Sequence, residues 1–210
     1  VLPFSRFRTP EGVVVDSLLS PEMRSTGEVM GLDTLYDTAF AKAQAGAGSP
    51  LPTEGKVFVS VANHDKRNVI IYAKMLEQLG FEIVSTGGTA DVLRRNGVNS
   101  TVASKFAEAN GQHSIVDMVR NGEIDLILNT PAGGAARSDG YEIRAAAVSV
   151  GCPVMTTISE FAAAVQAITA LRERSWEIIN LQEHGEFLRN ASTGEQGQDK
   201  GEQAREGELS

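Results

Sequence analysis

Few residues of this chain could form a disulfide or a metal site. Cys152 is the sole cysteine, which excludes an internal disulfide framework, and the three histidines are too scattered to assemble a metal-ligand cluster. No segment approaches the apolar length needed to cross a bilayer. We therefore expect a cytoplasmic protein without a metal, a bound cofactor or a membrane-spanning segment.

Basic residues are also in short supply. The formal net charge is −8 over 210 residues, whereas nucleic-acid binding needs a basic face. Five acidic and two basic residues lie from Glu195 onward, in a stretch rich in Gly, Glu and Gln. We expect residues 190–210 to form a disordered acidic tail.

The rest of the chain divides at a Gly- and Pro-rich linker, residues 46–55. Before it, residues 1–45 contain a helical run over 32–45. After it, residues 56–189 alternate apolar strands with amphipathic helices, which predicts a three-layer α/β/α domain with a five-stranded, mainly parallel sheet. The predicted strands are 57–61, 81–84, 100–102, 124–128 and 154–155, and the predicted helices are 65–79, 90–96, 114–121, 139–150 and 158–172. A final strand at 178–181 is also possible, and Thr157 to Glu160 match a capping box.

The most informative motif is Ser85-Thr86-Gly87-Gly88-Thr89, which joins a predicted strand to a predicted helix. Two glycines at such a turn let the backbone approach a ligand, and the helix N-terminus presents free N–H groups to an anion. Turns of this kind also occur simply to reverse the chain. The motif alone therefore leaves a phosphate site and a plain turn both open.

Polar residues follow the other predicted strands as well, where parallel α/β sheets bind ligands. Lys66 and Lys105 supply cations, and Asn129, Thr130 and Thr156 supply amide and hydroxyl groups. Each has an ordinary alternative: a solvated lysine, or an asparagine that ties down its own turn. Together on one edge they favour a pocket for a small phosphorylated ligand.

Signatures of catalysis are missing. The core has no Walker-type loop, no Gly-x-Ser-x-Gly elbow and no Cys–His pair. No pair of carboxylates stands at adjacent strand ends for acid–base work. Binding is better supported than catalysis.

The run from Pro21 to Gly31, PEMRSTGEVMG, followed by AFAKAQ at 39–44, closely resembles the end of the second synthetase half of the carbamoyl-phosphate synthase large subunit. Residues 56–189 resemble that subunit's C-terminal allosteric domain, which has the methylglyoxal-synthase-like fold. The resemblance implies that residues 1–45 are the end of the second, ATP-grasp synthetase half. It also implies that the chain is a piece of a longer one, in line with its start at Val1 rather than at a methionine.

The family resemblance implies a regulatory domain that does not itself turn over substrate. Its effectors would be UMP or IMP, and ornithine would act in some members, controlling carbamoyl phosphate synthesis for the pyrimidine and arginine pathways. The parent enzyme would be a ligase that uses ATP with Mg or Mn and works with a small glutaminase subunit. Self-association is also implied. Carried over residue by residue, the effector phosphate would contact Lys66, Thr86, Gly87, Gly88, Thr89 and Lys105, the pocket would include Asn129 and Thr130, and Thr156 would contact ornithine.

Two rival hypotheses assume the same fold but assign the domain a different function. Methylglyoxal synthase, a phosphate lyase, needs two aspartates, but the matching places read Ala109-Asn110-Gly111-Gln112 and Asn129-Thr130-Pro131. Arginines of some family members are replaced here by Gly134 and Ala135, which leaves the effector's identity open. The second rival hypothesis is that the domain is a purely structural or oligomerisation module.

Overall fold

Five short parallel strands form one sheet in the order β3-β2-β1-β4-β5. The computed structural model describes residues 29–103, 114–130, 133–180, 183–185 and 189, with the backbone alone for 133–139. The predicted three-layer α/β/α class and the parallel sheet are confirmed. The strands are β1 (Lys56–Ser60), β2 (Glu82–Ser85), β3 (Thr101–Val102), β4 (Leu126–Asn129) and β5 (Val154–Met155).

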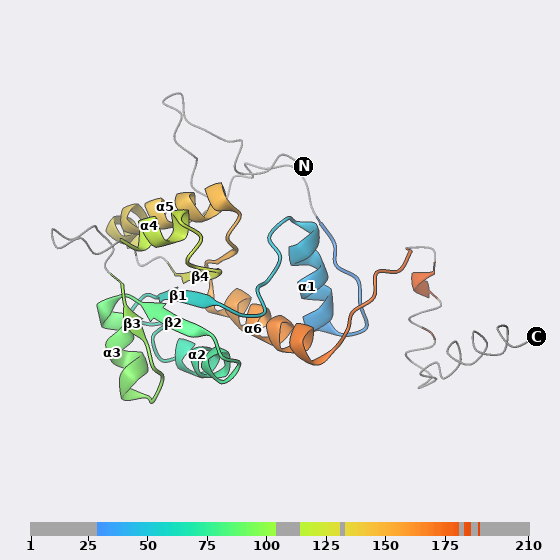
Figure 1. The fold of residues 1–210 in the computed structure, drawn as a ribbon, viewed down its shortest axis with the longest axis horizontal. Helices are drawn as coiled ribbons and strands as arrows, with labels where there is room; N and C mark the ends of the chain where they lie inside the picture. The colour runs from blue at the N-terminus through green and yellow to red at the C-terminus, as the bar shows by residue number, and fades with distance from the viewer. Residues whose placement is uncertain (1–28, 104–113, 131–132, 181–182, 186–188, 190–210) are drawn as a thin grey trace, which may run out of the picture.

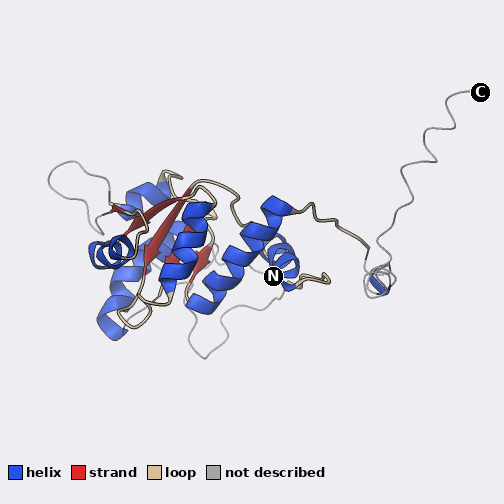
Figure 2. Cartoon of the chain, turned by 90° about the horizontal axis from the view of Figure 1, so that it is seen from below, coloured by secondary structure: helices blue, strands red, loops and turns tan. Residues whose placement is uncertain are grey.

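Helices cover both faces of the sheet (Figure 1). On one face lie α2, α3 and α6, and on the other α4 and α5 pack side by side. Figure 2 shows the sheet enclosed between these helical layers. The helices are α1 (Tyr36–Gly46), α2 (Val69–Gln78), α3 (Gly87–Arg95), α4 (Ile115–Arg120), α5 (Gly133–Val150) and α6 (Ile158–Glu173).

The central strand β1 contributes to two hydrophobic cores. Val57 and Val59 pack with residues of α2 and α6, whereas Phe58 packs with residues of α4 and α5. All three side chains are fully buried. Successive strand residues point to opposite faces, so a continuous apolar run is what a strand covered on both faces requires.

Helix α1 lies outside the sandwich and packs against α6 (Figure 1). Ala41 is buried in the core that α6 shares with α2, and Arg174 Nη2 lies 3.0 Å from Asp37 Oδ2. The end of the predicted region 1–45 is therefore in contact with the domain that follows it. The domain boundaries themselves stay predictions, and residues 1–28 and 190–210 lie outside the described part.

The predicted C-terminal ends of the helices after β1 all lie within one residue of those observed, and Gly80, with φ +87°, follows α2. The predicted starts are less accurate: α5 begins at Gly133 rather than at 139, because its first turns lie in the Gly-rich stretch that the sequence assigned to a loop. Thr157 caps α6 by accepting a bond from Glu160 N at 3.2 Å, but the Glu160 carboxylate accepts from Thr156 N at 2.9 Å, one residue before the capping-box position. The full reciprocal box occurs at α4 instead, between Ser114 and Asp117.

The possible strand at 178–181 is wrong for the residues described, 178–180. Residues 174–180 have no regular structure and run past α1 rather than along the sheet (Figure 1). Ile178 is 88% exposed, so this apolar run has no neighbouring strand to pair with. Periodicity alone could not show where the chain goes after α6.

Cys152 lies just before β5, where its thiol is largely buried and donates to the Ile124 carbonyl at 3.4 Å. Burial raises the pKa of this thiol to about 12, and the nearby Asp125 carboxylate adds to the effect. The sulfur therefore stays protonated at neutral pH. It therefore behaves as a small, buried hydrophobic side chain.

We expect Cys152 in the native protein to react with iodoacetamide at pH 8 far more slowly than in the urea-unfolded protein, because the thiolate is the nucleophile. Mass spectrometry gives a single-site readout, since the chain has one cysteine. The folded pKa is raised, so the stability contribution of the neutral thiol is complete below about pH 8.5, the unfolded value, and is lost as pH rises toward 12. Equal labelling rates in the native and unfolded states would contradict this assignment.

Candidate functional site

The candidate site lies at the carboxyl edge of the sheet, around β1. From β1 the chain proceeds outward to β2 and β3, and then returns to the other side of β1 to form β4. In doubly wound sheets the loops diverge at this switch point and leave a crevice for a ligand. The loop after β1 and the residues that end β4 flank this point.

The glycine pair predicted to hold a phosphate forms the first turn of α3. The helix begins at Gly87, three residues before the predicted start, and the extended Thr86 precedes it without making a side-chain cap. Both glycines are exposed, and a Cβ on Gly87 would meet no atom within 4 Å. Thr89 N already donates to the Thr86 carbonyl at 2.8 Å, so the N–H groups of Gly87 and Gly88 are the ones open to an anion.

Lys66 lies over this helix turn. A Cβ built on Gly88 would stand 3.1 Å from Lys66 Nζ, so the ammonium group occupies the space beside the second glycine. Lys66 precedes α2, which begins at Val69 rather than at 65. A cation at the positive end of a helix is electrostatically unfavourable unless an anion lies between them. The structure thus brings together the two elements that the sequence proposed for a phosphate.

The two threonines of the motif differ in exposure. Thr89 is 1% exposed and its hydroxyl lies 3.3 Å from that of Thr86, which is only partly buried. Thr86 is accordingly the more accessible of the two hydroxyl groups. The assignment of both threonines to an effector phosphate stays a prediction, and Lys105 lies outside the described residues.

Asn129 and Thr130, at the end of β4, are 6% and 8% exposed. Thr130 Oγ1 accepts from Ala62 N at 2.8 Å, so it ties the loop after β1 to the end of β4. Asn129 Oδ1 accepts from Arg144 Nη1 at 2.8 Å. Both side chains therefore have a bond within the protein, and their contact with a ligand stays a prediction.

Arg144 is a residue that sequence reasoning missed. It projects from α5, is fully buried, and is flanked in sequence by Ile143 and three alanines. A Cβ on Gly140, one turn earlier, would stand 2.4 Å from Arg144 Nη1 and 2.6 Å from Asn129 Oδ1. The signal that could have found the pair is an arginine within an otherwise apolar helical face, preceded by glycine at i−4.

Thr156, predicted to contact ornithine, follows β5 and is partly buried. Its N–H donates to the Glu160 carboxylate at the start of α6, so this backbone group already has a partner within the protein. His64, beside the loop after β1, is exposed and its Nε2 lies 3.4 Å from Asp65 Oδ2. Among the described residues, no group of three His, Cys, Asp or Glu side chains could hold a metal ion, and no helix has the length and apolar character to cross a membrane.

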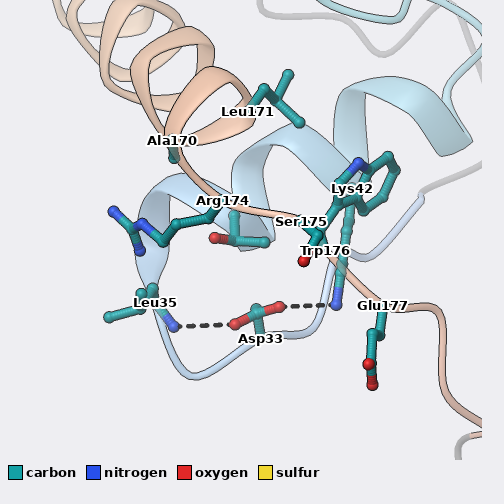
Figure 3. A pocket seen from close by; sticks show the side chains of 10 residues that line it. Asp33, Leu35, Lys42, Ala170, Leu171, Arg174, Ser175, Trp176 and Glu177 are labelled. Carbon is teal, nitrogen blue, oxygen red and sulfur yellow. Dashed lines mark hydrogen bonds and ion pairs between the residues drawn. The ribbon is translucent and has the colours of Figure 1, made fainter.

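A separate cavity of about 220 Å³ lies between α1, α6 and the segment that follows α6 (Figure 3). Two of its charged groups form an ion pair: Lys42 Nζ lies 2.7 Å from Asp33 Oδ2, and Leu35 N donates to the other carboxylate oxygen at 3.3 Å. Burial would raise the pKa of Asp33, but the bonds from Lys42 and from the Leu35 backbone outweigh it and lower the pKa. The bonds from Lys42 on α1 to Asp33 and to the Leu32 carbonyl hold the segment before α1 against that helix.

Comparison with known protein families identifies the domain that contains the sheet. Residues 68–156 match the family model of the MGS-like domain, so the chain contains a domain of this family. A solved methylglyoxal synthase from Elizabethkingia anophelis aligns with a TM-score of 0.45 and 17% identity, covering 64% of this chain and 91% of that one.

The chain is also similar to part of a much longer protein found in several bacteria. The chain is 65% identical over 201 residues to the carbamoyl phosphate synthase large chain of Kocuria rhizophila, covering 95% of this chain and 18% of that one. It is 68% identical over 191 residues to the same protein of Pseudarthrobacter chlorophenolicus, covering 90% and 17%. The chain therefore belongs to the carbamoyl phosphate synthase large chain family and spans less than a fifth of these relatives' length. The resemblance drawn from the sequence is confirmed.

We expect Gly140→Ala to destabilise the protein by about 1–3 kcal/mol, the cost of disturbing a buried bond to a charged group. An ordinary helical Gly→Ala change would stabilise by roughly 0.5–1 kcal/mol. Urea unfolding measures the free energy of unfolding of this variant and of a matched control. The control is Gly87→Ala, whose methyl group would meet no atom within 4 Å. A stabilised Gly140→Ala protein would show that the Arg144–Asn129 bond tolerates displacement.

We expect Asp33→Asn to lower the free energy of unfolding by on the order of 1–2 kcal/mol at pH 7, between the values for exposed and buried ion pairs. Because the pKa of Asp33 is lower in the folded protein than the value of about 3.9 expected in the unfolded chain, this contribution is present above the unfolded pKa and is lost as pH falls through the folded pKa. Urea titrations at pH 7 and pH 3 should therefore show the difference shrinking. Asp91→Asn, at an exposed position, controls for net charge, and a difference that is constant with pH would refute the role of the pair.

Proposed function

We propose that this chain is the regulatory domain of a carbamoyl phosphate synthase large chain and binds a nucleoside monophosphate, UMP or IMP, at the carboxyl edge of its sheet. The observation that carries the proposal is the position of Lys66 Nζ beside the first turn of α3. An ammonium group, open helical N–H groups and the Thr86 hydroxyl together form a set of donors suited to a phosphate.

In this proposal the domain itself is not catalytic. The described ends of β1, β2 and β4 present lysine, glycine, threonine and asparagine, and Asp65 beside them lies within reach of His64. The methylglyoxal synthase alternative needs an aspartate where Asn129 and Thr130 stand, and its second position, Asn110, lies outside the described residues. The edge is therefore better suited to binding a phosphorylated ligand than to abstracting a proton.

The rest of the large chain would carry the reaction, an ATP-dependent synthesis of carbamoyl phosphate in the cytoplasm, with Mg or Mn and a small glutaminase subunit. An effector acts only through its different affinities for two states of a protein. The surface most suited to contact the synthetase half includes Met30, Tyr36 and Ile178, which are 74%, 67% and 88% exposed. Control by ornithine through Thr156, and self-association, belong to the same proposal.

We expect the chain to bind UMP or IMP more tightly than inorganic phosphate, and Lys66→Ala to weaken binding about ten- to hundredfold. A charge-assisted hydrogen bond contributes roughly 1.5–3 kcal/mol, and each 1.4 kcal/mol is tenfold. Isothermal titration calorimetry measures all three ligands with the same protein. Lys74→Ala removes an equal charge from an exposed position on α2 and is the matched control.

Two outcomes would contradict the proposal. If no nucleotide binds the parental chain, this edge does not form an effector site in the 210-residue chain. If nucleotides bind but Lys66→Ala and Lys74→Ala behave alike, the ligand binds elsewhere on the molecule.

A further inference from the structure

We propose that Arg144 is a positioning residue for the nucleotide site: it fixes the Asn129 amide so that this side chain offers only hydrogen-bond donors to the ligand. The inference rests on the proposed function and adds a residue to its site. It starts from the 2.8 Å bond between Arg144 Nη1 and Asn129 Oδ1.

The chemistry of arginine decides the orientation of the amide. A guanidinium group has five N–H donors and no acceptor, so it can bind only the oxygen of an asparagine side chain. With Oδ1 held by Arg144, the Nδ2 amino group is directed elsewhere, and no described residue accepts a hydrogen bond from it. Asn129 is 6% exposed, and a buried amide without a partner is unfavourable by about 1–3 kcal/mol. A ligand acceptor at this edge would satisfy it.

The hydroxyl group of the neighbouring residue, Thr130, is likewise left with a donor to offer. Thr130 Oγ1 accepts from Ala62 N at 2.8 Å, so its proton remains available to donate. Both residues stand where β4 ends beside β1, at the switch point of the sheet. With the Lys66 ammonium group and the first turn of α3, the edge becomes a surface of donors. Such a surface selects ligands rich in acceptor oxygens, such as a phosphate ester with its sugar hydroxyls and base carbonyls.

The spacing of the strands fits one extended ligand. Neighbouring strands are roughly 4.8 Å apart, so the ends of β2 and β4, on either side of β1, are separated by about 10 Å. A phosphate at α3 would leave the remainder of a nucleoside monophosphate to reach Asn129. Gly140 has a part in this arrangement, because a side chain there would meet both Arg144 Nη1 and Asn129 Oδ1.

The decisive variant is Asn129→Asp. The carboxylate keeps an acceptor for Arg144 and strengthens that bond by charge, so the free energy of unfolding should be unchanged or higher. It replaces the donor amino group with a second anionic acceptor, so UMP binding should weaken at least tenfold. Asn180→Asp, at an exposed position beyond α6, is the control for the added charge. A residue with a purely structural role would leave UMP affinity unchanged in Asn129→Asp.

A double-mutant cycle then tests Arg144 itself. Arg144→Met should weaken UMP binding in the native background and have no further effect in an Asn129→Ala background, because Arg144 acts through Asn129. Equal weakening in both backgrounds would overturn the positioning role. If Arg144→Met does not fold, Arg144→Lys takes its place in the same cycle, and the same two outcomes support or overturn the positioning role.

The two proposals fail in different ways. Calorimetry of the parental chain with UMP and IMP, and of Lys66→Ala and Asn129→Asp with UMP, separates them. Binding that Lys66→Ala weakens but Asn129→Asp does not would overturn the inference about Arg144 and leave the effector site standing. Absence of binding by the parental chain would overturn both.

Discussion

The backbone pairing of β1 is the constraint on which the rest of the structure depends. This strand pairs with β2 on one side and β4 on the other, and its apolar side chains are buried on both faces. A strand enclosed in this way cannot shift register without moving Val57 and Val59 from one core to the other. The loop that follows it, with Lys66, is therefore held in a fixed position relative to α3 and to the end of β4.

Much of the fold and part of the site could be predicted from local patterns. The alternation of apolar strands with amphipathic helices predicts the parallel sheet, and two glycines between a strand and a helix predict the open start of α3. Lys66 and the glycine turn could be assigned to one edge because parallel strands end on the same side. These inferences need only the sequence neighbours of each residue.

The features that the sequence could not predict depend on contacts between distant segments. Arg144 resembles a solvated arginine until β4 places Asn129 against it, 15 residues earlier in the chain. Gly140 resembles a weak point in a helix until those two side chains are seen to need its space. Ile178 has the composition of a strand residue, but the sheet offers it no edge, because the chain turns toward α1 after α6.

The burial of Arg144 also has an energetic side. Removing a guanidinium group from water costs several kcal/mol even after the protein relaxes, and apolar residues of similar volume often replace buried charges without loss of stability. Helix α5 already packs Ile143, Ala146 and Ala147 into the core, so an apolar residue at 144 would serve packing as well. Packing alone therefore does not account for an arginine at this position. What an apolar residue could not do is hold the Asn129 oxygen, and with it the direction in which the amide donates at the switch point of the sheet.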